Sequence, residues 1–248
     1  MKVKSALIGI IVIIIFSLFL FDFTLQSKTT NNPEKVGMNF IKCTPAQFLL
    51  KGIDTTKQIS PLFENLGTHT YKVSTDNELA QRFFNQGIRL TYAFNHAEAH
   101  RSFMEAARLD PKLAMAFWGQ AYTLGPNIND PLPTENRKVK YNEAIAKALQ
   151  LAPMASKKEQ ALIHALSFRC SADLDKDVSD LNQSYMVEME KVMKRYPNDS
   201  DILTLYAASV MNTVPWNYWD KEGNPSPNIL EAKLALEKAI EINPNSPG

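Results

Sequence analysis

His96 and His100 stand four residues apart in the stretch FNHAEAHRSFMEAARLDP, with Glu98 between them. Residues at i and i+4 are neighbours on one helix face, so the two imidazoles could share a divalent transition metal, as in an HExxH helix. Glu98 cannot be the base of that motif, because two helical steps rotate it by about 200° from His96. A closed zinc site needs about four ligands, and His69 is a further candidate. Alternatively, both histidines occupy half-buried packing positions and each makes one hydrogen bond.

Conventional catalytic motifs are absent from the sequence. It contains no G-x-S-x-G elbow, no phosphate-binding loop, no CxxC pair and no HExxH helix, which are the local signatures of common hydrolases, nucleotide-binding proteins and redox enzymes. The sequence therefore predicts no cofactor other than a transition metal, and it favours a function other than catalysis. Cys43 and Cys170 are the only cysteines, and outside the cytoplasm they either pair or remain free thiols.

Two loop-like segments carry residues suited to binding. VPWNYWD brings together Trp216, Tyr218 and Trp219, and GPNIND places Asn127 and Asn129 on either side of an isoleucine. Large aromatic side chains with polar groups are typical of binding surfaces. The alternative is that the aromatic residues fill the groove between neighbouring repeats and that GPNIND only caps a helix.

The elements that position these residues are helices, each ending just before a proline. The segments MEAARLDP, AKALQLAP, EKVMKRYP and EKAIEINP lead into Pro111, Pro153, Pro197 and Pro244 with small or apolar residues at helical spacing. Because proline cannot continue a helix, each segment predicts a helix end. Their recurrence at intervals of roughly 42 to 47 residues predicts stacked helical hairpins, each burying its apolar face on the next.

The stretch Ala80–Leu113 fits the ~34-residue tetratricopeptide pattern. The longer proline spacing implies insertions, which we place at GPNINDPLPTENRK, SADLDKDVSD and VPWNYWDKEGNPSPN, and which solenoids collect on one side. Ser74 or Thr75 is the expected N-cap of the first helix. The core positions of this unit and the proline that closes it are Phe83, Gly87, Leu90, Ala99, Phe103, Ala106 and Pro111.

The same register assigns roles to polar residues. His96 and His100 replace two normally apolar packing residues, whereas Glu98 falls at a solvent-facing position. The first helix of the unit places four side chains on the expected concave face, where amides and guanidinium groups suit an extended peptide. These are Arg82, Asn85, Gln86 and Arg89.

The first residues differ in character from the repeats. MKVK precedes an uninterrupted apolar run, Ala6–Phe21, which predicts a signal anchor or a signal peptide over residues 1–26. Because no A-x-A-like cleavage site follows, we favour an uncleaved anchor at residues 6–25 over export after cleavage. A polar linker and irregular lead-in, residues 27–75, would then carry the repeats of residues 76–248, about four units with the last incomplete, on the extracytoplasmic side.

Composition excludes one class of partner. The 248 residues are 45% hydrophobic and 21% charged, with a net charge of +1. Nucleic-acid binding requires a clustered basic excess, so no nucleic-acid partner is expected. Membrane contact is expected only through the N-terminal segment.

Several blocks resemble an exported bacterial subgroup of tetratricopeptide-repeat (TPR) proteins. They are QGIRLTYAFNHAEAHRSFMEAARLDP with its GPNIND continuation, LGTHTYKVST, EQALIHAL and DSDILTLYAASVMNTVPWNYWDKEGNP, and the resemblance covers Leu66–Gly248. His96 and Glu98 match the subgroup's block, but His100 departs from it. Relatives of this kind continue with histidine-containing segments and further repeats, so the chain resembles their N-terminal half.

Together these patterns predict an all-α, TPR-like helical-hairpin solenoid. Its expected function is that of an extracytoplasmic scaffold that binds a protein or peptide partner through the concave face. The competing hypothesis is a metal-binding protein or metal-dependent enzyme that uses His96, with His69, in a site completed by a missing C-terminal half.

Overall fold

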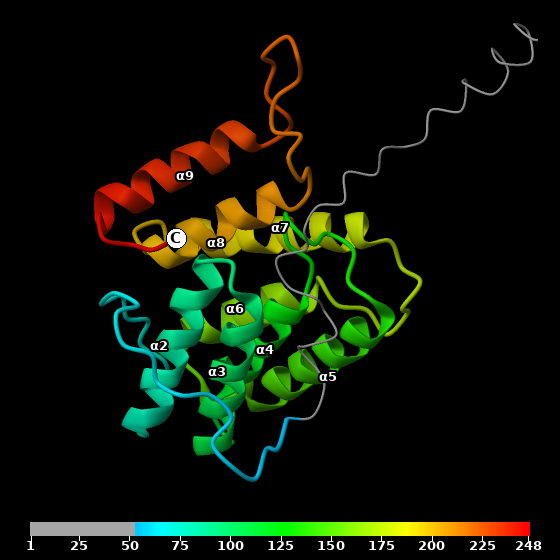
Figure 1. Cartoon of the computed structure of the whole chain (residues 1–248). Coiled ribbons are helices and arrows are strands. Elements are labelled where there is room, and N and C mark those ends of the chain that lie inside the picture. The colour runs from blue at the N-terminus through cyan, green and yellow to red at the C-terminus, as the bar shows by residue number, and fades with distance from the viewer. Residues whose placement is uncertain (1–52) are drawn as a thin grey trace, which may run out of the picture. The chain divides into compact units, whose positions relative to one another are not determined.

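The computed structural model describes residues 53–248. Within this range the protein is all-helical, with eight α-helices and no strand (Figure 1). The helices are α2 (Glu78–Tyr92), α3 (His96–Leu109), α4 (Ala114–Leu124), α5 (Glu135–Leu151), α6 (Lys157–Ser167), α7 (Val178–Arg195), α8 (Ser200–Met211) and α9 (Ile229–Ile242), and the 3-10 turn η2 (Ala152–Met154) follows α5. The predicted all-α class is confirmed for these residues.

All four predicted helix ends are confirmed. Helices α3, α5, α7 and α9 each end two residues before their proline. The N-cap prediction for the first helix was wrong by two to three positions, because Asn77 accepts hydrogen bonds from the amides of Leu79 and Ala80. An asparagine oxygen at this position satisfies amides that have no partner within the helix.

Each helix from α2 to α8 packs against the next helix in the sequence, and α4 also contacts α2 and α6. Such contacts bury one face of most helices, as the apolar spacing predicted, whereas α4 and α8 are buried on nearly all sides. Helix α9 packs on α8 and, with the loop that precedes it, forms the upper edge of the described part in Figure 1.

Phe103 forms the centre of the contact among α2, α3 and α4. Its side chain is fully buried and lies against Gly87 of α2 and Gly119 of α4. A Cβ atom at either glycine would come within 2.5 Å of the phenyl ring. The backbones therefore approach Phe103 closely only because both positions lack a side chain. Gly87, predicted as a core position of the repeat unit, lies at this helix contact.

Residues 53–77 contain no helix but are not a free spacer. Tyr71 and Val73 are 4% and 3% exposed, so this segment contributes to the core. Between residues 53 and 248, no helix combines the length and apolar character that a membrane span requires. The predicted signal or anchor at residues 1–26 and most of the predicted linker lie outside the described residues.

Candidate functional site

An extended segment, residues 59–74, lies along α2, and we call it the strap. The side chains of α2 bind its main chain. Gln86 accepts a hydrogen bond from the amide of Phe63 through Oε1 (2.7 Å) and donates to the carbonyl of Pro61 through Nε2 (2.9 Å). Asn85 Oδ1 accepts from the amide of Tyr71 (3.0 Å).

The two ends of α2 continue this pattern. Gln81 accepts from the amide of Val73 (3.0 Å) and donates to the carbonyl of Tyr71 (2.8 Å). Arg89 Nε donates to the carbonyl of His69 (2.6 Å). Asn85, Gln86 and Arg89, predicted to bind a peptide partner, therefore contact the chain's own strap. The fourth predicted residue, Arg82, is exposed.

Three glutamates fix the strap from other helices. Glu105 of α3 accepts from the amide of Ile59 (2.9 Å), and Glu159 of α6 accepts from the amide of Ser74 (2.8 Å). Glu98 accepts from the hydroxyl of Ser60 (2.8 Å) and pairs with Arg101. The prediction that Glu98 faces solvent was therefore wrong, because the strap covers that position.

The three candidate metal ligands make different contacts. His69 Nε2 lies 2.9 Å from Oδ1 of Asp201, which also accepts from the hydroxyl of Tyr92 (2.8 Å). His100 Nδ1 lies 3.3 Å from Oγ1 of Thr123. Among residues 53–248, no three histidine, cysteine, aspartate or glutamate side chains converge to hold a metal ion. A metal at His96 would therefore require donors beyond those that this part of the chain brings together.

His96 is the exceptional histidine. It is 8% exposed, yet neither ring nitrogen has a hydrogen-bond partner. Burial and, to a smaller extent, the positive charges of Arg137 and Arg169 lower the pKa of its imidazole to about 4, against the opposing effects of the nearby Thr123 backbone and Asp130. His96 is thus a neutral, buried imidazole with one donor and one acceptor unused.

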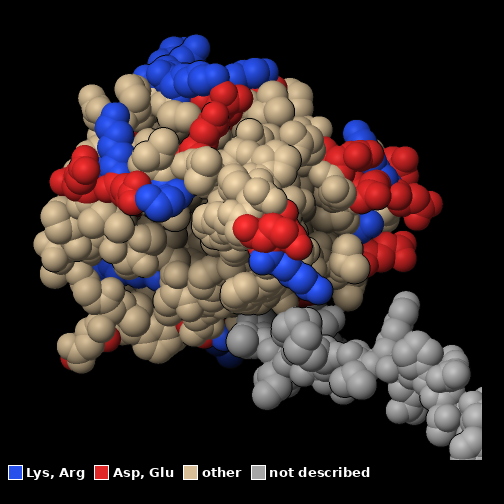
Figure 2. Space-filling model, turned by 90° about the horizontal axis from the view of Figure 1, so that it is seen from above, with Lys and Arg blue, Asp and Glu red and all other residues tan. Residues whose placement is uncertain are grey.

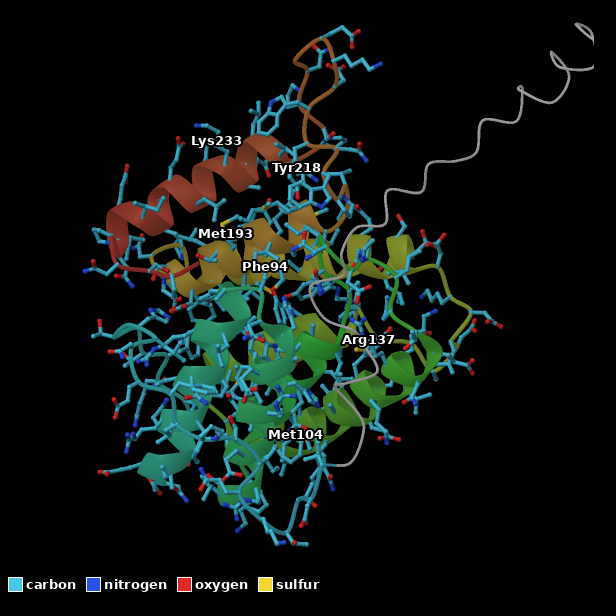
Figure 3. The ribbon with its side chains drawn as sticks, viewed as in Figure 1. Phe94, Met104, Arg137, Met193, Tyr218 and Lys233 are labelled. Atoms are coloured by element: carbon cyan, nitrogen blue, oxygen red, sulfur yellow. The ribbon has the colours of Figure 1, made fainter. Side chains whose placement is uncertain are left out.

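The turn before His96 supplies an aromatic neighbour. Phe94 adopts a left-handed backbone with φ of 58°, and its ring centroid lies 5.8 Å from that of His96. Figure 3 shows Phe94 at the junction between the end of α2 and α8. A non-glycine residue in this conformation is uncommon and here fixes the direction in which the chain enters α3.

Arg137 holds the GPNIND loop beside His96. Its guanidinium donates to the carbonyls of Leu124 (3.0 Å) and Gly125 (2.9 Å) and pairs with Asp130. The side chain is almost fully buried, and these partners satisfy its charge. Arg137 was not among the functional residues predicted from the sequence. The available signal was its helical register with the buried Tyr141, since an arginine on an apolar helix face needs internal partners.

Within the loop, Asn127 forms the turn. Its Oδ1 accepts from the amides of Asn129 (2.9 Å) and Asp130 (3.1 Å). This leaves the Nδ2 group of Asn127 as its unused donor. Asn129 is half-buried.

The aromatic segment meets the GPNIND loop. Trp216 Nε1 donates to the carbonyl of Ile128 (2.8 Å), across 88 residues of sequence. Trp216 and Trp219 remain 63% and 50% exposed, whereas Tyr218 is half-buried and lies at the base of the loop (Figure 3). Two of the three predicted insertions therefore lie together. The middle one contacts the first turns of α5, where Asn142 and Lys138, the last residue of the first predicted insertion, donate to the carbonyls of Ser171 and Leu174.

No family model, curated protein or solved structure matches this chain.

Cys170 is the one cysteine within the described residues, and its thiol is free. Burial raises the pKa of its thiol to about 12, so it is not a thiolate at neutral pH. Cys43 lies outside the described residues, and the disulfide stays a prediction.

Proposed function

We propose that this protein is a TPR-like helical-repeat scaffold that binds a protein or peptide partner outside the cytoplasm. Sequential helix packing and the four helix ends before prolines support a repeat architecture. The apolar N-terminal run supports placement on the extracytoplasmic side, either anchored by residues 6–25 or exported after cleavage.

The strap carries the proposal. Helix α2 binds an extended main chain through amide side chains spaced along one face, with Gln81, Asn85 and Gln86 each pairing with strap amides or carbonyls. Main-chain recognition of this kind accepts an extended peptide largely independently of its sequence. The internal contact therefore supports the inference that this type of helix surface can hold polypeptide.

Since the strap occupies α2, we place the partner surface at the two joined insertions. The hydrogen bond from Trp216 to Ile128 holds the aromatic segment on the GPNIND loop, and the exposed faces of Trp216 and Trp219 remain open. Figure 2 views the side occupied by α9 and this loop, and it shows uncharged surface interspersed with acidic and basic groups, some near its centre and others toward its edges. Interfaces commonly combine such an aromatic centre with a polar rim.

Affinity capture from the exported fraction tests this surface. The full chain and a Phe168→Ala variant, which removes an exposed aromatic residue on another element, should retain the same partner. A Trp216→Ala, Trp219→Ala double variant should lose most of it, because aromatic anchors dominate binding energy. Equal capture by all three proteins would contradict the assignment of this surface.

The metal-dependent alternative rests on His96, whose two nitrogens lack partners. Elemental analysis of the purified full chain tests it. The alternative requires a stoichiometric transition metal that is lost in His96→Leu and retained in His164→Leu. Metal-free protein from metal-supplemented cells would exclude it for this chain.

A further inference from the structure

The orphan imidazole of His96 faces a cavity of about 190 Å³. The cavity lies between the ends of α2 and α4 on one side and helices α8 and α9 on the other. The GPNIND loop closes part of it through Pro126, Asn127 and Ile128. A cavity of roughly 150 Å³ in another protein accommodates benzene, so this one has room for a single-ring molecule.

A buried polar group without a partner is costly. Leaving a hydrogen-bonding group unpaired after removing it from water typically costs about 1–3 kcal/mol. The other two described buried histidine rings avoid this cost, since His69 contacts Asp201 and His100 contacts Thr123. His96 is therefore the one of these three imidazoles whose hydrogen bond is still available to a ligand.

The rest of the lining defines the chemistry that the cavity accepts. Its apolar walls come from Phe94, Pro126, Ile128, Ala208, Met211 and Leu236. The polar groups include the hydroxyl of Tyr122 and the unused amide nitrogen of Asn127. No Asp, Glu, Lys or Arg side chain lines the cavity, and Gly248 contributes no side chain to it. A charged ligand would lose its hydration without gaining an ionic side-chain partner here.

We propose that this cavity binds a small, uncharged, single-ring molecule whose hydroxyl group pairs with the imidazole of His96. The ring of the ligand would contact the apolar walls, and its hydroxyl would supply a hydrogen-bond partner for one nitrogen of the His96 imidazole. Burial keeps the imidazole neutral near pH 7, since its pKa is lowered to about 4, and a neutral imidazole can either accept from or donate to a hydroxyl. The GPNIND loop borders both this cavity and the proposed partner surface, but ligand binding at His96 does not require a bound partner.

Three probes of similar size test the proposal on the purified full chain. Phenol carries the ring and the hydroxyl, toluene lacks the hydroxyl, and benzoate carries a charge. Titrations are followed by NMR of 15N-labelled histidine side chains, so that the His96 signal reports its own environment. We expect saturable shifts of the His96 signal with phenol, about tenfold weaker binding of toluene, and weaker binding still of benzoate.

Two variants separate binding from folding. His96→Leu keeps an apolar wall but removes the imidazole, so its phenol affinity, followed by amide shifts of α2 and α8, should fall to that of toluene. Leu236→Trp fills the cavity and should abolish binding of both probes. Adding either probe to this variant should therefore no longer shift its His96 signal. His164→Leu, an exposed change on α6, should bind phenol as the unmodified chain does.

The proposal is overturned if the unmodified chain binds none of the probes, or binds benzoate best. It is also overturned if His96→Leu retains the preference for phenol over toluene, because the hydroxyl would then pair elsewhere. Unchanged phenol binding in Leu236→Trp would place the probe outside this cavity.

Discussion

His96 and His100 are buried as neutral imidazoles, and this makes the stability of the helical body depend on pH. Burial lowers the pKa of both to about 4, whereas a histidine in an unfolded chain titrates near 6.5. Between these values the unfolded state binds more protons than the folded state. The free energy of unfolding should therefore fall as the pH drops from about 6.5 toward 4, by at most about 3 kcal/mol per histidine.

Chemical denaturation at about pH 7, 6 and 5 measures this dependence. Carboxylates with a lowered pKa, such as Glu105 beside Arg108, lose their contribution only below the ordinary glutamate range, so the histidines dominate this window. His100→Leu should reduce the slope, and His164→Leu, at an exposed position, should not. A flat profile in the unmodified chain would refute the buried, neutral state.

The contact of Phe103 with two glycines predicts a sharp steric effect. Gly119→Ala would place a Cβ 2.5 Å from the Phe103 ring and should destabilise the fold by about 1–3 kcal/mol. Adding Phe103→Leu should cost less in that variant than in the unmodified chain, because the clash is relieved. Thermal unfolding of the four proteins gives the coupling, and strictly additive effects would contradict the contact.

Single residues were predictable where their role follows from helical register. Phe103 and Gly87 were placed in the core by matching the sequence to the tetratricopeptide pattern, and both are at the α2–α3–α4 contact. Glu98 was misplaced because its environment is set by the strap, which is distant in sequence. The lack of a hydrogen-bond partner for His96 was not predictable either, since it depends on how residues of α4, α8 and the GPNIND loop are arranged around the ring.

At the scale of the element, the strap depends on a few side chains of α2. Gln86 contacts the amide of Phe63, the carbonyl of Pro61 and the hydroxyl of Ser102. Gln86→Leu removes the acceptor of the Phe63 amide, while the carbonyl of Pro61 and the hydroxyl of Ser102 keep other partners. It should therefore lower the free energy of unfolding by about 1–3 kcal/mol. It should also accelerate hydrogen exchange at Phe63 and proteolysis within residues 59–74. Arg82→Leu, an exposed change on the same helix, is the control and should alter neither.

Unchanged exchange at Phe63 in Gln86→Leu would show that other contacts hold the strap.

Helix ends were predictable at this scale because proline fixes them through its own geometry. The strap was not, because an extended segment without alternation carries no periodic signal and is recognised only by the side chains that receive it.

For the whole molecule, contacts between sequence neighbours predict that damage stays local. Ala232 of α9 is 2% exposed and packs at the α8–α9 end. Ala232→Asp buries a charge there and should raise hydrogen exchange in α8 and α9 while α2–α4 remain protected, as in repeat proteins. Leu234→Asp, on the exposed face of α9, should have little effect. Uniform loss of protection along the chain would argue for one cooperative unit.

The all-helical class was predictable because four helix ends recur at similar spacing. The meeting of two insertions through Trp216 and Ile128 was expected only in general terms, as loops on one side. Which insertions meet depends on how the helices pack, and the middle insertion contacts the first one at Lys138, a residue that lies within α5.

The strap also determines how tightly a competing peptide must bind to α2 in order to displace it. Residues 75–77 alone separate it from the first residue of that helix, so its effective concentration at the α2 face is of millimolar order or above. A free peptide with the same contacts would be outcompeted at ordinary cellular concentrations. The affinity of a peptide for α2, measured in the intact chain, would therefore include the free energy of releasing the strap. Only a ligand with contacts beyond the main chain could displace the strap.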